Sequence, residues 1–306
     1  MITGKIKFTI VFVLGMLAGI FIISQFAFKE NEPQKKNKND KQIAPPQIFL
    51  PQVPDDISFA GEKVPLERWE VYEAFDRELI YNYNNTGNIS YILKLSKRFF
   101  PVIEQKLKEN GLPDDFKYLC VAESNLQNLS SPVGAKGFWQ FMKDTAPGYN
   151  MEVSDNVDER YNVEKSTVGA CRYLKTAFEK YGNWTAAAAS YNCGMGRFSD
   201  LSTFQQTKYY YDLQLPEETS KYLFRILAIK YLLTNVQEMG YMVNDSNGYQ
   251  PVKTKTVIIS SSIPDLAQWA LNNGTTYKML KILNPWLRDR SLNVKSGKDY
   301  VIKLPA

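Results

Sequence analysis

The stretch Gly111-Leu-Pro-Asp-Asp-Phe-Lys-Tyr-Leu-Cys-Val-Ala-Glu-Ser124 decides how the centre of this chain folds. A proline followed by two acids is typical of the start of a helix. Four side chains then recur at spacings of three and four on one face of that helix: Phe116, Leu119, Cys120 and Glu123. Desolvation on this apolar stripe is predicted to raise the pKa of Glu123, as suits a general acid. A glutamate hydrogen-bonded inside the core is the alternative.

Histidine is absent from the sequence, which restricts the available chemistry. Serine and cysteine triads that use imidazole are excluded, and so are most zinc sites. The three cysteines, Cys120, Cys171 and Cys193, are too scattered for a metal motif and are predicted to be buried free thiols, with one unassigned disulfide as the alternative. We therefore expect no metal and no cofactor. Glycoside cleavage fits, because carboxylates suffice for it.

Helical signals dominate the chain between residues 65 and 240. Apolar residues recur at spacings of three and four from Val168 onward, and Gly182 follows as a C-cap would. Another helix is predicted to begin at Pro216, with two acids in its first turn. The sequence predicts an all-α domain over residues 57–247.

Residues 253–306 differ in character from this domain. A β-rich run at 257–259, two short apolar-periodic segments and a final strand at 300–304 give the order β-α-α-β. The predicted fold is therefore mainly α, with a small C-terminal module.

The N-terminal part is predicted to be an anchor and a tether. Residues 8–28 are long and apolar enough to cross a bilayer as a helix, and no small-residue cleavage site follows, so residues 1–28 are interpreted as a signal anchor. Residues 29–56 are polar and Pro-rich, which is typical of a linker. By the positive-inside rule alone, the lysines that follow the span would place the body in the cytoplasm.

Charge is concentrated at the N-terminus. Residues 1–42 hold seven Lys and three acids, a net of +4 out of a total of +5, which leaves the body almost neutral. A basic surface of the kind that binds DNA or RNA is therefore not expected.

Three blocks carry a resemblance to a known family. They are Glu123-Ser124 with Gly134-Ala-Lys-Gly-Phe-Trp-Gln-Phe-Met142, then Ala189-Ser-Tyr-Asn-Cys-Gly-Met-Gly-Arg197, and then Glu218-Thr-Ser-Lys-Tyr222. In this order and spacing, over about residues 55–240, they resemble the lytic transglycosylases with a goose-lysozyme-like SLT domain. The resemblance implies a lysozyme-like α-helical catalytic domain.

Site residues follow from the matching positions. The resemblance implies that Glu123 is the catalytic acid and base. It implies substrate contacts for Ser124, Gln140, Met142, Tyr191, Asn192 and Tyr222. Ser190 stands where the family has alanine, and Gly-Phe-Trp-Gln replaces its Gly-Leu-Met-Gln. Phe138 and Trp139 are interpreted as core residues.

The reaction implied is cleavage of the β-1,4 bond between N-acetylmuramic acid and N-acetylglucosamine in peptidoglycan, without water, to leave 1,6-anhydro ends. No Asp or Glu stands between Ser124 and Lys143, which favours a mechanism with one carboxylate. A hydrolytic muramidase of the same fold, using Asp144 or Asp155, is the enzymatic alternative. A non-catalytic wall-binding protein and a cytoplasmic regulatory protein are the others.

Residues 253–306 resemble a degenerate LysM domain, in which Ser260–Pro264 replace the usual Gly-Asp-Thr turn. Glycan binding by this module stays open, because fold alone does not carry function. The resemblance places the protein in the bacterial cell envelope, anchored in the membrane with its body on the periplasmic side. The implied partners are peptidoglycan glycan strands and the membrane, with other wall enzymes left open.

Overall fold

The computed structural model describes residues 50–241 and 245–306. The anchor predicted at residues 1–28 and most of the linker lie outside the described residues. Within the described ranges, none of the helices has the length and apolarity needed to span a bilayer.

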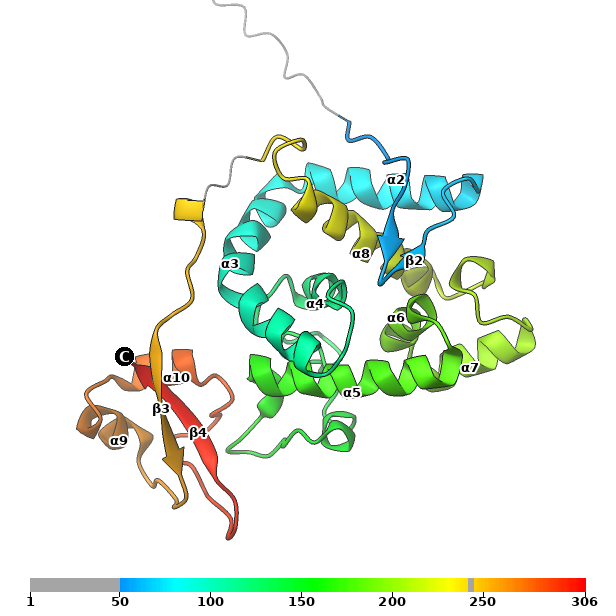
Figure 1. The fold of residues 1–306 in the computed structure, drawn as a ribbon. Helices are drawn as coiled ribbons and strands as arrows, with labels where there is room; N and C mark the ends of the chain where they lie inside the picture. The colour runs from blue at the N-terminus through cyan, green and yellow to red at the C-terminus, as the bar shows by residue number, and fades with distance from the viewer. Residues whose placement is uncertain (1–49, 242–244) are drawn as a thin grey trace, which may run out of the picture. The chain divides into compact units, whose positions relative to one another are not determined.

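The first part of the chain is a helical domain, drawn in blue to yellow in Figure 1. The elements of this domain are β1 (Ser58–Phe59), β2 (Glu62–Lys63), α2 (Trp69–Asn84), α3 (Thr86–Glu109), α4 (Phe116–Ser124), η2 (Ala146–Tyr149), η3 (Glu159–Tyr161), α5 (Val163–Tyr181), α6 (Trp184–Cys193), α7 (Met195–Phe204), η4 (Tyr210–Asp212) and α8 (Glu217–Thr234). Strands β1 and β2 form a short antiparallel hairpin, with Phe59 opposite Glu62. The predicted helical character of this region is confirmed, but the short β1–β2 hairpin was not predicted.

Helix α4 is held by its neighbours α3 and α8, while α2 packs on α8 and α5 packs on α3 and α6. Its apolar stripe is buried as predicted, since Phe116, Leu119 and Cys120 are fully covered. The carboxylate of Asp115, just before α4, accepts hydrogen bonds from the Ala60 amide (2.7 Å) and from Lys230 Nζ (2.8 Å). The start of α4 is thereby joined to the hairpin and to α8.

Local sequence signals explain where these helices begin and end. Asn162 caps α5 by accepting from the amides of Glu164 and Lys165, and Gly182 ends that helix in the left-handed conformation. Helix α4 ends because Asn125 takes the left-handed conformation, with φ of 52°. This stop leaves Glu123 in the last turn of α4.

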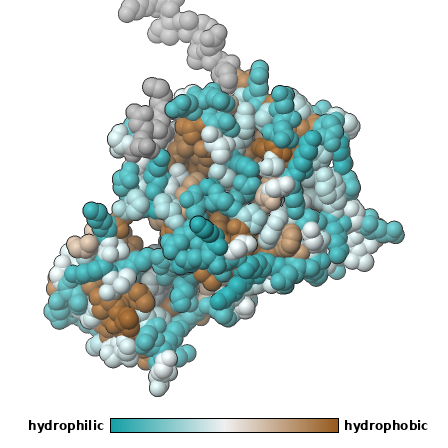
Figure 2. All heavy atoms as spheres, in the orientation of Figure 1, coloured by the Kyte–Doolittle hydropathy of each residue, from teal (hydrophilic) through white to brown (hydrophobic). Residues whose placement is uncertain are grey.

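The C-terminal module has the predicted order β-α-α-β: β3 (Thr254–Ile259), α9 (Leu266–Asn272), α10 (Tyr277–Leu283) and β4 (Tyr300–Pro305). The two strands are antiparallel, with Val257 opposite Ile302. Val157 and Tyr161, which precede α5, are buried in the same apolar cluster as the module's own core. Figure 2 shows an apolar patch on the surface of this module. Ile258, Leu271 and Ile282 are exposed apolar residues of the module.

Candidate active site

Glu123 is the centre of the candidate site. The residue is partly exposed to solvent, yet the surrounding protein desolvates its carboxyl strongly enough to raise the pKa to about 7. The hydrogen bond from Tyr222 and the charge of Arg225 act in the opposite direction. The raised pKa predicted from the apolar stripe is confirmed.

Tyr222 lies buried in α8, and its hydroxyl donates a short hydrogen bond to Glu123 Oε1. Burial, followed by the neighbouring carboxylate, raises the pKa of Tyr222 well above its ordinary value. The phenol therefore stays protonated and remains a donor. The structure brings these two predicted site residues into direct contact.

Two charged residues that the sequence reasoning missed lie beside this pair. Glu218 and Arg225 form an ion pair, with Nη1 at 2.7 Å from Oε1 and Nη2 at 3.3 Å from Oε2. The Arg225 charge lowers the pKa of Glu123 and the Glu218 charge raises it. A signal for both existed, because positions 218, 222 and 225 are spaced to share one face of a helix.

Neither Asp144 nor Asp155, the acids considered for a hydrolytic mechanism, is among the groups that shift the pKa of Glu123. Asp144 and Asp155 are exposed side chains, and Glu218 is the acid whose charge acts on the carboxyl. Glu218 is itself engaged by Arg225.

The loop of residues 134–142, here called the Gly-Phe-Trp-Gln loop, carries two predicted glycan contacts. Gln140 has a φ of 48°, and its Nε2 donates to the carbonyl oxygens of Gly137 (2.7 Å) and Leu129 (3.3 Å). Met142 is 41% exposed, so its side chain is available for contact. Phe138 and Trp139 are buried, as predicted for core residues.

Helix α6 supplies two further predicted site residues. The hydroxyl of Tyr191 donates to the carbonyl of Trp139 at 2.7 Å, which joins α6 to the Gly-Phe-Trp-Gln loop. Burial raises the pKa of Tyr191, with Glu123 as the next cause, so the two groups interact electrostatically. Asn192 Oδ1 accepts a hydrogen bond from Thr219 on α8 at 2.8 Å.

Ser124 is a predicted contact that the structure buries. It is 2% exposed, and its hydroxyl donates to the carbonyl of Cys120 in the previous turn at 3.3 Å. The three cysteines are free thiols; Cys120 and Cys171 are buried as predicted, whereas Cys193 is only partly buried. Across residues 50–241 and 245–306, no group of three or more Cys, Asp or Glu side chains could hold a metal ion.

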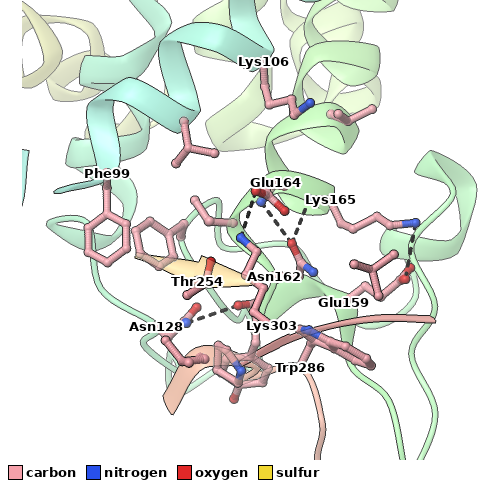
Figure 3. A pocket seen from close by; sticks show the side chains of 18 of the residues that line it. Phe99, Lys106, Asn128, Glu159, Asn162, Glu164, Lys165, Thr254, Trp286 and Lys303 are labelled. Atoms are coloured by element: carbon pink, nitrogen blue, oxygen red, sulfur yellow. Dashed lines mark hydrogen bonds and ion pairs between the residues drawn. The ribbon is translucent and has the colours of Figure 1, made fainter. Parts of the chain in front are cut away.

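A cavity of about 1020 Å³ lies elsewhere, between α3, the start of α5 and the C-terminal module. Figure 3 shows Phe99, Asn162, Trp286 and Lys303 around it. Glu123 does not line this cavity. The cavity and the perturbed carboxyl of Glu123 therefore lie at different places in the structure. We assign the candidate active site to Glu123, because its desolvated carboxyl can exchange a proton near neutral pH.

Comparison with known proteins finds two matched regions in the chain. Residues 100–213 match the transglycosylase SLT domain, and residues 255–306 match the soluble lytic transglycosylase C-terminal LysM-like domain. The chain is 25% identical over 227 residues to membrane-bound lytic murein transglycosylase D of Escherichia coli (strain K12), covering 70% of this chain and 49% of that protein. The same values hold for the protein of that name from Escherichia coli O6:H1 (strain CFT073).

The chain thus spans about half the length of the curated relatives it matches. Glu123, Gln140 and Tyr191 all lie within the matched SLT segment, whereas Tyr222 lies beyond it. On these findings the chain carries a transglycosylase SLT domain and a C-terminal LysM-like domain, and it is homologous to membrane-bound lytic murein transglycosylase D.

Proposed function

We propose that this chain is a peptidoglycan lytic transglycosylase that cuts the bond between N-acetylmuramic acid and N-acetylglucosamine and leaves 1,6-anhydro-muramic ends. The observation that carries the proposal is one carboxyl, that of the partly exposed residue Glu123, with a pKa raised to about 7 and a buried phenol donating to it. A group with this pKa exists in both protonation states near neutral pH, so it suits both acid and base roles.

In the first step Glu123 donates its proton to the glycosidic oxygen, and the C–O bond to the muramic anomeric carbon breaks. The substrate's acetamido oxygen stabilises the positive charge at that carbon. Glu123, now ionised, then accepts the proton of the muramic six-hydroxyl as its oxygen bonds to the anomeric carbon. The proton count balances without water, and the carboxyl returns to its starting state.

Tyr222 supports the second step more than the first. A hydrogen bond to the ionised carboxylate stabilises that form, so the phenol favours the state that acts as a base. Arg225 acts in the same direction through its charge. Substrate contacts from Ser124, Gln140, Met142, Tyr191 and Asn192 remain part of the proposal.

The test is a mass spectrum of peptidoglycan digested with the purified protein. Anhydro ends, each lighter by one water than a lysozyme product, are expected. Reducing-end muramic acid as the initial product would instead support the hydrolytic muramidase, and a Glu218→Gln variant would then show whether Glu218 is its second carboxylate. No cleavage at all would leave the non-catalytic glycan-binding protein.

We further propose that the protein is anchored in the bacterial membrane by residues 1–28, with the body on the periplasmic side and peptidoglycan strands as its partner. The resemblance of the SLT and LysM-like domains to wall enzymes supports this placement. A topology reporter fused after Ala306 tests it, because a cytoplasmic signal would contradict the periplasmic orientation.

A further inference from the structure

Arg160 makes a buried ion pair that reaches into the Gly-Phe-Trp-Gln loop. Its side chain is 3% exposed and that of Asp158 is 8% exposed. Nε donates to Asp158 Oδ1 at 2.9 Å and Nη2 to Oδ2 at 2.7 Å. Nη1 donates to the carbonyls of Gly134 and Phe141, each at 3.2 Å. One guanidinium therefore holds both ends of the loop.

The backbone of Arg160 presses on the middle of the same loop. An ideal Cβ placed on Gly137 would lie 1.8 Å from the Arg160 carbonyl oxygen, and the φ of Gly137 is +81°. The loop thus contacts Arg160 at its two ends and at its turn. Such bidentate, planar contacts define geometry more than they add net stability, because desolvation of buried charges offsets much of the attraction.

The other side of this contact belongs to the C-terminal module. Residues 152–161, here called the strap, form an antiparallel bridge between Val157 and Leu287. The amide of Asp158 donates to the Trp286 carbonyl at 2.9 Å. The carboxylate that orients Arg160 is therefore carried by backbone fixed to the module.

Side chains add a second tie between strap and module. Glu152 Oε2 accepts a hydrogen bond from the Tyr300 hydroxyl at 2.7 Å and a short one from Lys298 Nζ. The Glu152 amide in turn donates to Glu159 Oε2 at 2.8 Å, within the strap. Nearby, Lys303 pairs with Glu164 at 2.9 Å, so β4 is also joined to the start of α5.

We propose that the C-terminal LysM-like module, acting through the strap, positions the Gly-Phe-Trp-Gln loop for glycan binding, with Arg160 as the positioning residue. The inference rests on the proposed function, since it requires that Gln140 and Met142 on this loop contact the substrate. Trp139 in the same loop also accepts the hydrogen bond of the Tyr191 hydroxyl, so the loop is joined to α6 as well.

The experiment compares Arg160→Lys and Arg160→Gln in the full chain, with the exposed Arg290→Gln as the matched control. Lysine keeps the charge opposite Asp158 but lacks the planar fork that reaches both carbonyls. A Lys298→Met/Tyr300→Phe double variant loosens the strap from the module side only. Each change is also placed in a Glu123→Gln background, and binding of a GlcNAc–MurNAc tetrasaccharide is measured by calorimetry.

Below their melting temperatures, both Arg160 variants should bind the tetrasaccharide roughly 10-fold or more weakly, because small misplacements of contact groups have large effects. In the active background KM should rise by a similar factor, while the pH dependence set by Glu123 stays unchanged. The Lys298→Met/Tyr300→Phe double variant should also bind the tetrasaccharide more weakly than the parent, but by a smaller factor. Arg290→Gln should match the parent.

Binding and KM within about twofold of the parent, with only a lower melting temperature, would reduce Arg160 to a stability role and overturn the proposal. Unchanged binding in the double variant would remove the module from it. If the wild-type chain cuts no glycan, the proposed function fails, yet the binding comparison still decides the positioning role. If Arg160→Gln does not fold, Arg160→Lys and the double variant supply the answer.

Discussion

At the scale of single residues, Glu123 concentrates the chemistry in one carboxyl. The change Glu123→Gln keeps the shape and can still accept the Tyr222 hydrogen bond, but removes the transferable proton and the base. Because acid and base roles are each worth roughly 10²- to 10⁴-fold, we expect activity to fall by at least that factor. Release of soluble fragments from peptidoglycan measures it, and undiminished release would remove Glu123 from the mechanism.

The same substitution should change stability with pH. The pKa of Glu123 is raised from 4.5 to about 7, so the folded state holds the proton more tightly than the unfolded state. The stability of the wild-type chain therefore falls as pH rises through this window, by roughly 3 kcal/mol at most. Thermal melts should show Glu123→Gln gaining on the wild type between pH 5 and pH 8. An equal difference at both pH values would contradict the raised pKa.

Activity should follow the same ionisation. The first step requires protonated Glu123, so the rate should decline on the alkaline side of about pH 7. In Tyr222→Phe the lost hydrogen bond no longer favours the ionised form, so this alkaline limb should move to higher pH. Initial rates across pH 5 to 9, compared between the two proteins, test this. A limb that stays in place would mean that another group titrates there.

At the scale of elements, the Gly-Phe-Trp-Gln loop depends on two glycines for different reasons. Gly134 and Gly137 both have positive φ, but only Gly137 has backbone where a Cβ would lie. Gly134→Ala should therefore cost about 1–2 kcal/mol of left-handed strain. Gly137→Ala should cost more and displace the loop, because the Arg160 carbonyl cannot move aside as a side chain could.

Chemical denaturation of these two variants gives the comparison, with glycan binding as the second readout. Gly134→Ala is the matched control, since it shares the loop and the sign of φ. Equal losses of stability would show that conformational strain alone matters and that the contact with Arg160 does not constrain the loop.

At the scale of the whole molecule, the start of the described part is held by contacts within that part. The β1–β2 hairpin is held by Asp115 and Lys230, and Pro51 is the first buried residue of the described part. A chain without residues 1–42 should therefore be soluble, keep its melting temperature and remain active on peptidoglycan. Failure of this truncated chain to fold would count against a tether in this region.

Truncation at the other end should behave differently. Ending the chain at Asn247 would uncover Val157 and Tyr161, which are buried with the module's core. Exposing an apolar side chain of this size costs roughly 1.5–3 kcal/mol. We expect unchanged bond specificity, weaker retention on insoluble peptidoglycan and a lower melting temperature. A melting temperature equal to that of the full chain would mean that the strap does not need the module.

The sequence by itself determined the helical domain, the β-α-α-β module, the burial of the α4 stripe and the raised pKa of Glu123. Each of these depends on local periodicity or on neighbours within one helix, such as Phe116 and Leu119 beside Glu123. The C-cap at Gly182 is equally local, which is why the sequence predicted where α5 ends.

Only the tertiary structure decided which partners these residues meet. The contact of Tyr222 with Glu123 joins positions 99 residues apart, and the charge of Arg225 on α8 acts on the same carboxyl. Two other contacts likewise join segments distant in sequence. The Arg160 carbonyl lies against Gly137, where a Cβ would not fit, and the Trp286 carbonyl accepts a hydrogen bond from the Asp158 amide. Periodicity specifies which face of a helix is buried but carries no information on what packs against it, and that pairing forms only when the chain folds.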